Sequence, residues 1–259
     1  MKKIITLAVT SLMMLSCTYK TTVSTHSLLW IEDKPEQVFH SHDVFPSVPD
    51  SLWNALGLQD GVPSSISCIL LGVDDEKILV DAGLGAPFSM LMQTLKIQGV
   101  TSEDLKLIYI THMHGDHIGG LLKEGKATFP NAEVYINRVE AEAWEAMDST
   151  KNGQQLHVLE AYKDHLHLFE AGDVLPGEVK TIAAYGHTPG HTLFQKDDLL
   201  VIGDLIHGAA LQLEHPEYCP FFDMDPETAI ASRKRILEYA RENGLKMYGM
   251  HLPSPGYIE

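Results

Sequence analysis

Short apolar runs separated by polar turns predict buried strands in the first half of the chain. Residues 66–73 and 77–80 are mostly apolar, and the acidic residues 74–76 between them predict a hairpin turn. Residues 107–110 and 132–136 are two further short apolar runs. Apolar runs of four to eight residues are typical of strands that are fully buried. The pattern therefore predicts a buried sheet.

The second half of the chain alternates between helical and strand patterns. The clearest helix spans residues 226–243, where Asp223 or Asp225 can cap the beginning and Gly244 ends it. Residues 101–104 resemble a helix start with an N-cap hydroxyl. Other helices are expected at residues 88–98, 140–147 and 154–165, and strands at 180–184, 192–195, 199–202 and 245–250. This order of elements predicts an α/β sandwich with helices outside.

The first 25 residues have the layout of an export signal. Lys2 and Lys3 precede an almost wholly apolar stretch at residues 4–15, which is too short for a comfortable membrane span. Residues 1–17 therefore form a predicted signal segment of the lipoprotein type, with Cys17 as the lipidated residue and residues 18–25 as a polar tether. The alternative is an ordinary cleavable signal with a chance cysteine. Either way we expect export, to the periplasm or to a lipid anchor on the cell envelope.

Length and composition favour a single folded domain over residues 26–259. The chain has 259 residues, of which 44% are hydrophobic, and this suits a globular core. The formal net charge of −16 disfavours nucleic acid as a partner, because such a surface repels phosphate. Cys68 and Cys219 could pair in an oxidising compartment, although Cys68 lies in an apolar run and is expected to be a buried small hydrophobe.

A dense group of metal-ligand residues follows the apolar run at residues 107–110. The motif is His112-x-His114-x-Asp116-His117. In an extended segment His112 and His114 lie on the same face, and Gly115 allows a sharp turn toward a second point. Imidazole and carboxylate groups suit Zn²⁺ and its first-row neighbours. One loop can therefore serve two metal ions.

Four more candidate residues follow predicted strands further along the chain. His187 and His191 lie in Gly-His-Thr-Pro-Gly-His-Thr, Asp204 follows the apolar residues 199–202, and His251 follows the last strand. Taken alone, each of these residues could equally well be a metal ligand or a structural residue. Together with the first motif they form a set.

These motifs resemble, in order, the metallo-β-lactamase superfamily from about residue 66 to the C-terminus. The resemblance implies a metallo-β-lactamase-type αββα sandwich that binds two divalent metal ions, with Zn²⁺ as the default. Its implied ligands are His112, His114 and His191 for one ion and Asp116, His117 and His251 for the other. Asp204 would bridge the two ions, and His187, not itself a ligand, would order the loop or support one of the ligands.

Other segments resemble the branch that holds methyl parathion hydrolase and related lactonases. They include Phe129-Pro130, Glu140-x-x-x-Trp144, Gly203 to His207, Asp223-x-Asp225-Pro226, Arg233-Lys234 and the segment from His251 to Gly256. Trp144 would then line the substrate pocket, or else pack on the core. His207 is either a neighbour of Asp204 or a surface residue. Phe45, Trp53 and Leu56 either cover the site or fill the core.

The resemblance implies a hydrolase in which a hydroxide held between two metal ions attacks a carbonyl carbon or a phosphorus. Asp116 and Asp204 are the expected catalytic residues, since either could orient the water molecule or move its proton. The chain has no Gly-x-Ser-x-Gly motif that would supply a serine nucleophile. The expected substrate is a small lactone, aryl ester or phosphotriester.

Four alternatives remain in view. A zinc β-lactamase often has a cysteine where this chain has Asp204, and a glyoxalase II-like thioesterase usually has a more basic C-terminal region. An RNA-processing enzyme would need more basic surface. A metal-binding lipoprotein without catalysis, such as a sensor or carrier, is disfavoured because suitable residues fill all seven expected ligand positions. The sequence leaves the native metal and the oligomeric state open.

Overall fold

The computed structural model describes residues 27–73, 76–148 and 150–259. The predicted signal segment, Cys17 and the tether lie outside these ranges, as do residues 74–75 of the expected hairpin turn. Among the described residues, no helix has both the length and the apolar character needed to cross a membrane.

The first sheet has six strands in the order β1-β4-β5-β6-β9-β10. Their bounds are β1 Ser27–Glu32, β4 Ser67–Val73, β5 Glu76–Val80, β6 Leu107–Ile110, β9 Glu133–Asn137 and β10 Leu166–Phe169. From β5 to β10 each neighbouring pair is parallel, whereas β1, β4 and β5 pair antiparallel. The carboxyl ends of β5, β6 and β9 therefore meet at one edge.

The second sheet also has six strands, in the order β11-β12-β13-β14-β15-β16. Their bounds are β11 Val174–Leu175, β12 Val179–Ala183, β13 Thr192–Lys196, β14 Leu199–Val201, β15 Lys246–Tyr248 and β16 Tyr257–Ile258. Two small hairpins lie apart from these sheets. They are β2 Val38–His40 with β3 Val62–Ser64, and β7 Leu122–Lys123 with β8 Lys126–Ala127.

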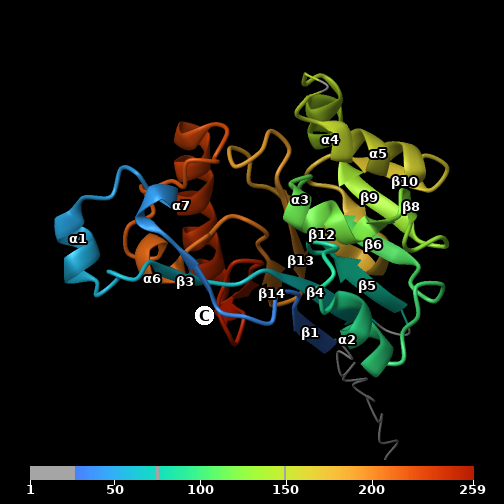
Figure 1. The fold of residues 1–259 in the computed structure, drawn as a ribbon, viewed down its shortest axis with the longest axis horizontal. Helices are drawn as coiled ribbons and strands as arrows, with labels where there is room; N and C mark the ends of the chain where they lie inside the picture. Colours follow the sequence, from blue (N-terminus) through green and yellow to red (C-terminus); the bar gives the residue numbers. More distant parts are fainter. Residues whose placement is uncertain (1–26, 74–75, 149) are drawn as a thin grey trace, which may run out of the picture.

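Helices cover the outer faces of the two sheets, and α7 lies on the opposite side of the strands from α4 and α5 (Figure 1). The helices are α1 Asp50–Ala55, α2 Leu91–Ile97, α3 Gly115–Ile118, α4 Arg138–Glu145, α5 Gly153–Ala161, α6 Ala209–Gln212 and α7 Pro226–Asn243. Short 3-10 turns occur at His42–Val44, Gly119–Leu121 and Pro176–Glu178. At the start of helix α7 the Asp225 side chain accepts a hydrogen bond from Thr228 N. The helix ends at Gly244, whose φ of 61° lies in the left-handed region.

Alternating side chains of the first sheet enter two different cores. On β4, Cys68 and Leu70 pack toward α2, α4 and α5, whereas Ile69 and Leu71 pack against the second sheet. A strand that is buried on both faces reads as a continuous apolar run, as seen here. The layers are therefore helix, sheet, sheet and helix, which confirms the predicted αββα sandwich. The predicted burial of Cys68 is also confirmed, and neither Cys68 nor Cys219 is in a disulfide.

One predicted element is absent from the described part of the fold, strand β10 was not predicted, and one of the two alternatives for Phe45, Trp53 and Leu56 is confirmed. The helix start predicted at residues 101–104 is wrong: Thr101 N and Oγ1 do bond to Asp104 Oδ2, but β6 begins three residues later and leaves no room for a helix. The N-terminal segment forms a small core of its own, in which Phe45 and Trp53 pack with Leu211 of α6. These aromatic residues therefore fill a separate core and do not line the pocket described below.

Packing between the two sheets supplies a direct test of this architecture. Phe194 of β13 is buried between the sheets, whereas Phe221 is 69% exposed. We expect Phe194→Ala to lower the free energy of unfolding by about 3–5 kcal/mol, because it leaves a cavity. The matched change Phe221→Ala is expected to stay within about 0.5 kcal/mol. Urea denaturation measures both, and equal losses would contradict the assigned layers.

Candidate metal centre

Candidate ligands from both sheets converge at the edge where several strands end. The loop after β6 carries His112, His114, Asp116 and His117, and Asp204 follows β14. His251 follows β15, so segments distant in the sequence meet here. Such an edge is a usual place for binding sites, because loops there are free to carry function.

Three imidazole nitrogens form one compact group. His112 Nε2 lies 3.0 Å from His114 Nδ1, and His187 Nε2 lies 2.9 Å from His114 Nδ1 and 3.1 Å from His112 Nε2. Asp204 completes this group of possible ligands. Zinc bound at about 2.0–2.1 Å in a tetrahedron holds its ligand atoms roughly 3.3 Å apart, so the observed spacing suits such an ion.

A second group consists of Asp116, His117 and His251. Asp204 lies between the two groups: its Oδ1 is 2.9 Å from His117 Nε2, and its Oδ2 is 3.1 Å from His251 Nε2. The same Oδ2 is 3.2 Å from His187 Nε2. The carboxylate therefore contacts both groups, as a bridging ligand would.

Two orphaned polar atoms test whether cations fit here. His117 Nε2 and Asp204 Oδ1 are buried and have no hydrogen-bond partner among the described residues, because their 2.9 Å contact lacks hydrogen-bond geometry. A buried polar atom without a partner costs about 1–3 kcal/mol. A divalent ion between a neutral imidazole nitrogen and a carboxylate oxygen satisfies both, so these residues fit the implied metal ions.

The outward nitrogens of three histidines are held by oxygen acceptors. The pairs, each 2.8 Å apart, are His117 Nδ1 with Asp81 Oδ2, His187 Nδ1 with Asp223 Oδ1 and His251 Nδ1 with Ser65 O. A carboxylate or carbonyl oxygen only accepts, so each Nδ1 carries the proton. In the neutral ring, which is the form that binds a metal ion, each Nε2 then has its lone pair facing the centre of the site.

Asp81 reaches this position through an unusual backbone conformation. Its φ is 59°, in the left-handed region, which costs on the order of 1 kcal/mol for a residue with a side chain. Thr111 N and Thr111 Oγ1 both donate to its carboxylate at 2.8 Å, and His117 shares it. These contacts tie the end of β5 to the loop that carries the ligands.

The prediction that His191 is a ligand and His187 a loop residue does not match the structure. His191 Nδ1 donates to Ala184 O at 3.0 Å, and its Nε2 accepts from Asp204 N at 3.1 Å. Both of its nitrogens are therefore engaged with backbone, whereas His187 Nε2 faces His112 and His114. The geometry therefore places His187, and not His191, in a group of possible ligands, and His191 contacts the backbone that presents Asp204.

Glu140, which begins the Glu140-x-x-x-Trp144 motif, supports the site in a way that the sequence did not predict. It is fully buried, and its Oε1 accepts from Met113 N at 2.8 Å and from Trp144 Nε1 at 2.6 Å. Its Oε2 accepts from Thr188 Oγ1 at 2.7 Å and Gly190 N at 2.8 Å. One carboxylate thus joins the loop of His112 and His114 to the loop of His187. Trp144 packs in the core behind His114 and does not line the pocket, so the core-packing alternative describes its position.

His207 lies beside the bridging position. It is fully buried, and its Nε2 is 3.1 Å from Asp204 Oδ2, so it is a neighbour of Asp204 and not a surface residue. Its ring stacks on that of His251, with centroids 5.0 Å apart.

The electrostatics of the centre favour added positive charge. Burial opposes ionisation of Asp204, but the surrounding histidines, His117 first, hold its pKa well below the usual value. Burial also opposes charge on His187, yet hydrogen bonds to Asp204 and Asp223 raise its pKa to about 9. Desolvation lowers the pKa of His114 to about 3. The buried, ionised Asp204 needs positive charge beside it to compensate for its lost hydration. Divalent ions bound between the histidines would supply that charge.

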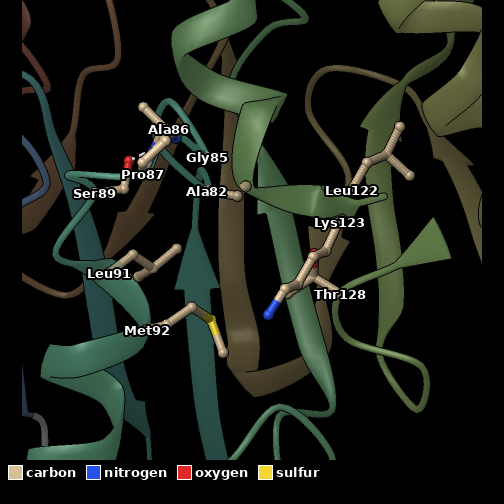
Figure 2. A pocket seen from close by; sticks show the side chains of 11 residues that line it. Ala82, Gly85, Ala86, Pro87, Ser89, Leu91, Met92, Leu122, Lys123 and Thr128 are labelled. Atoms are coloured by element: carbon tan, nitrogen blue, oxygen red, sulfur yellow. Dashed lines mark hydrogen bonds between the residues drawn. The ribbon is translucent and has the colours of Figure 1, made fainter. Parts of the chain in front are cut away.

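A pocket of about 340 Å³ opens onto these ligands. We call it the site pocket; its lining comprises Val38, His40, Ile66, His114, Gly115, Asp116, Asp204, Phe222 and His251. Figure 2 shows a different pocket of about 320 Å³, with Leu91, Met92 and Pro87 around it and Lys123 as its one charged side chain. That second pocket holds none of the candidate ligands, so the chemistry belongs to the site pocket.

The chain is similar to known proteins over part of its length. The chain is 29% identical over 160 residues to an N-acyl homoserine lactonase of Bacillus thuringiensis and 28% identical over 146 residues to the uncharacterized protein YobT of Bacillus subtilis (strain 168). These matches cover 59% and 54% of this chain and 58% and 61% of the two relatives, so the chain spans about three fifths of their length.

Solved structures share the architecture over nearly the whole chain. Hydrolase AbOPH of the β-lactamase superfamily has a TM-score of 0.77 at 27% identity, covering 90% of this chain and 89% of that one. AidC, a dizinc quorum-quenching lactonase, has a TM-score of 0.80 at 24% identity and 90% coverage of both chains, which speaks for the fold alone.

The family assignment rests on the longest sequence match. Residues 61–251 match the family described as the metallo-beta-lactamase superfamily. This range begins before β4 and ends at His251, so it includes every candidate ligand. The chain therefore belongs to the metallo-β-lactamase superfamily.

Proposed function

We propose that this protein is a dinuclear metal-dependent hydrolase that opens lactone rings, with aryl esters and phosphotriesters as further candidate substrates. The observation that carries the proposal is the position of Asp204, whose carboxylate contacts both groups of ligand atoms: its Oδ2 lies 3.2 Å from His187 Nε2, and its Oδ1 lies 2.9 Å from His117 Nε2. The relatives named N-acyl homoserine lactonases favour a lactone over the other substrate classes.

In this proposal His112, His114 and His187 hold one divalent ion, and Asp116, His117 and His251 hold the other, with Asp204 shared. Bound there, the two ions would polarise the substrate oxygen and activate a water molecule near neutral pH. Zn²⁺ is the ion that the imidazole-rich ligand set favours.

The protein's own groups contribute positioning and proton handling. Asp116 is half-buried and lines the site pocket, so its carboxylate can accept a proton from an attacking water molecule. Val38, Ile66 and Phe222 give the pocket apolar walls, which suit the hydrocarbon part of a small ester or lactone. The net charge of −16 disfavours nucleic acid and strongly anionic substrates.

We also propose export and lipid anchoring through Cys17, which would place the hydrolase on the cell envelope. We expect cells fed a labelled lipid precursor to label the wild-type protein and not Cys17→Ala. Cys219→Ala serves as the control and should stay labelled. Equal labelling of wild type and Cys17→Ala, or none in either, would contradict the anchor.

A substrate panel tests the catalytic proposal. We expect metal-loaded protein to hydrolyse acyl-homoserine lactones faster than aryl esters, phosphotriesters, nitrocefin or S-lactoylglutathione, and chelation to abolish this activity reversibly. Asp204→Asn should lower kcat/KM by at least about 100-fold, because it removes the shared carboxylate. Asp60→Asn, at an exposed position, should behave as wild type. Undiminished turnover in fully chelated protein would contradict the mechanism.

The proposed ligand role of His187 in place of His191 makes a separate prediction. We expect His187→Ala to retain about one metal equivalent, because it removes a ligand. His191→Ala should retain two equivalents with lower thermal stability, since it loses two buried backbone contacts. Elemental analysis after dialysis measures the metal content, and the reverse pattern would restore His191 as the ligand.

A further inference from the structure

A buried arginine of α7 lies behind one of the candidate ligands. Arg233 is 1% exposed, although its guanidinium is permanently charged. Its Nη2 lies 3.2 Å from Asp223 Oδ2, and Asp223 Oδ1 lies 2.8 Å from His187 Nδ1. A continuous chain of charged and polar contacts therefore runs from α7 to a nitrogen that faces the metal centre.

The remaining guanidinium hydrogens fix other segments near the site. Arg233 Nε donates to Leu205 O at 2.8 Å, directly after Asp204, and Nη1 donates to Pro216 O at 2.8 Å. The planar group thus contacts three separate stretches of chain at once. A lysine ammonium is a single point of charge and cannot reproduce this fork.

The backbone next to Asp223 is fastened to the same loop. Met224 N donates to His187 O at 3.1 Å, and Asp225 N donates to Gly186 O at 2.8 Å. Asp223 is therefore held on one side by Arg233 and on the other by the loop that carries His187. Its carboxylate has little freedom to turn away from the imidazole.

A gain in folding stability does not by itself account for the buried ion pair between Arg233 and Asp223. A buried ion pair often stabilises a fold no better than an apolar pair of similar volume, because both charges lose their hydration. Groups that orient a metal-binding histidine, however, typically change metal affinity by about 10–100-fold when they are removed. Orientation of His187 is the role that the geometry supports.

We propose that Arg233 is a positioning residue for the metal centre, which acts through Asp223 to keep His187 Nε2 facing His112 and His114. It sets the metal affinity of that group and leaves the affinity of the group formed by Asp116, His117 and His251 unchanged. This inference rests on the ligand assignment of the proposed function.

Cobalt titration of the metal-free protein tests the inference. Binding is followed by visible absorption and by competition with a chelator, in wild type, Arg233→Lys and the matched control Arg235→Lys. Arg235 is on the same helix and donates to the backbone oxygen of Ala183 at the surface. We expect Arg233→Lys to weaken one of two cobalt sites by about 10–100-fold, with the other site and the control unchanged within about threefold.

Asp223→Asn provides a second variant if Arg233→Lys does not fold. It should weaken the same cobalt site, and the double variant should lose no more than the worse single variant, since both act through one chain of contacts. Lower thermal stability with both affinities intact would overturn the inference, as would equal weakening of both sites. Fewer than two cobalt ions in the wild type would overturn the ligand assignment itself.

Discussion

The site depends on a single carboxylate that is buried among imidazoles. Asp204 is 2% exposed, and its oxygens lie within 3.2 Å of four histidine nitrogens, those of His117, His187, His207 and His251. An isolated buried charge is very costly, so its surroundings must compensate for it. Four imidazoles surround this carboxylate, which is the arrangement expected where divalent ions bind.

Other buried acids hold the histidines in place. Asp81 supports His117, Asp223 supports His187, and Glu140 joins the two loops on which the ligands lie. Each acid comes from a different element, so the orientation of the site is distributed over both halves of the sandwich. The positions of the candidate ligands are therefore fixed by buried contacts with the packed fold, although the ligands themselves lie on loops.

The local part of this design could be predicted from the sequence. The cluster from His112 to His117 follows a buried strand, and spacing alone indicated its chemistry. The choice between His187 and His191 could not be predicted, because it depends on Asp223 and on the backbone of Asp204, which are distant in sequence.

Two further features were not predicted from the sequence: the burial of Glu140 and the edge strand β10. Glu140 was noted only as part of a motif, because an acid in an amphipathic helix normally faces solvent and the helical pattern did not indicate its burial. Strand β10 was missed because it lies at a sheet edge and its residues are mostly half-exposed, which weakens the apolar pattern. The predicted strands 66–73, 107–110 and 199–202 were found because both of their faces are covered.

The hairpin of β2 and β3 connects the pocket wall to the small N-terminal core. Val38 and His40 form part of the pocket wall, yet β2 precedes the family match and packs beside a small core of its own. A substitution at Val38 would therefore alter the pocket wall without removing a candidate ligand. The hairpin is nevertheless joined to the ligand segment, because Ser64 Oγ donates to His251 O at 3.2 Å, so a change in its backbone would also reach a histidine of the candidate metal centre.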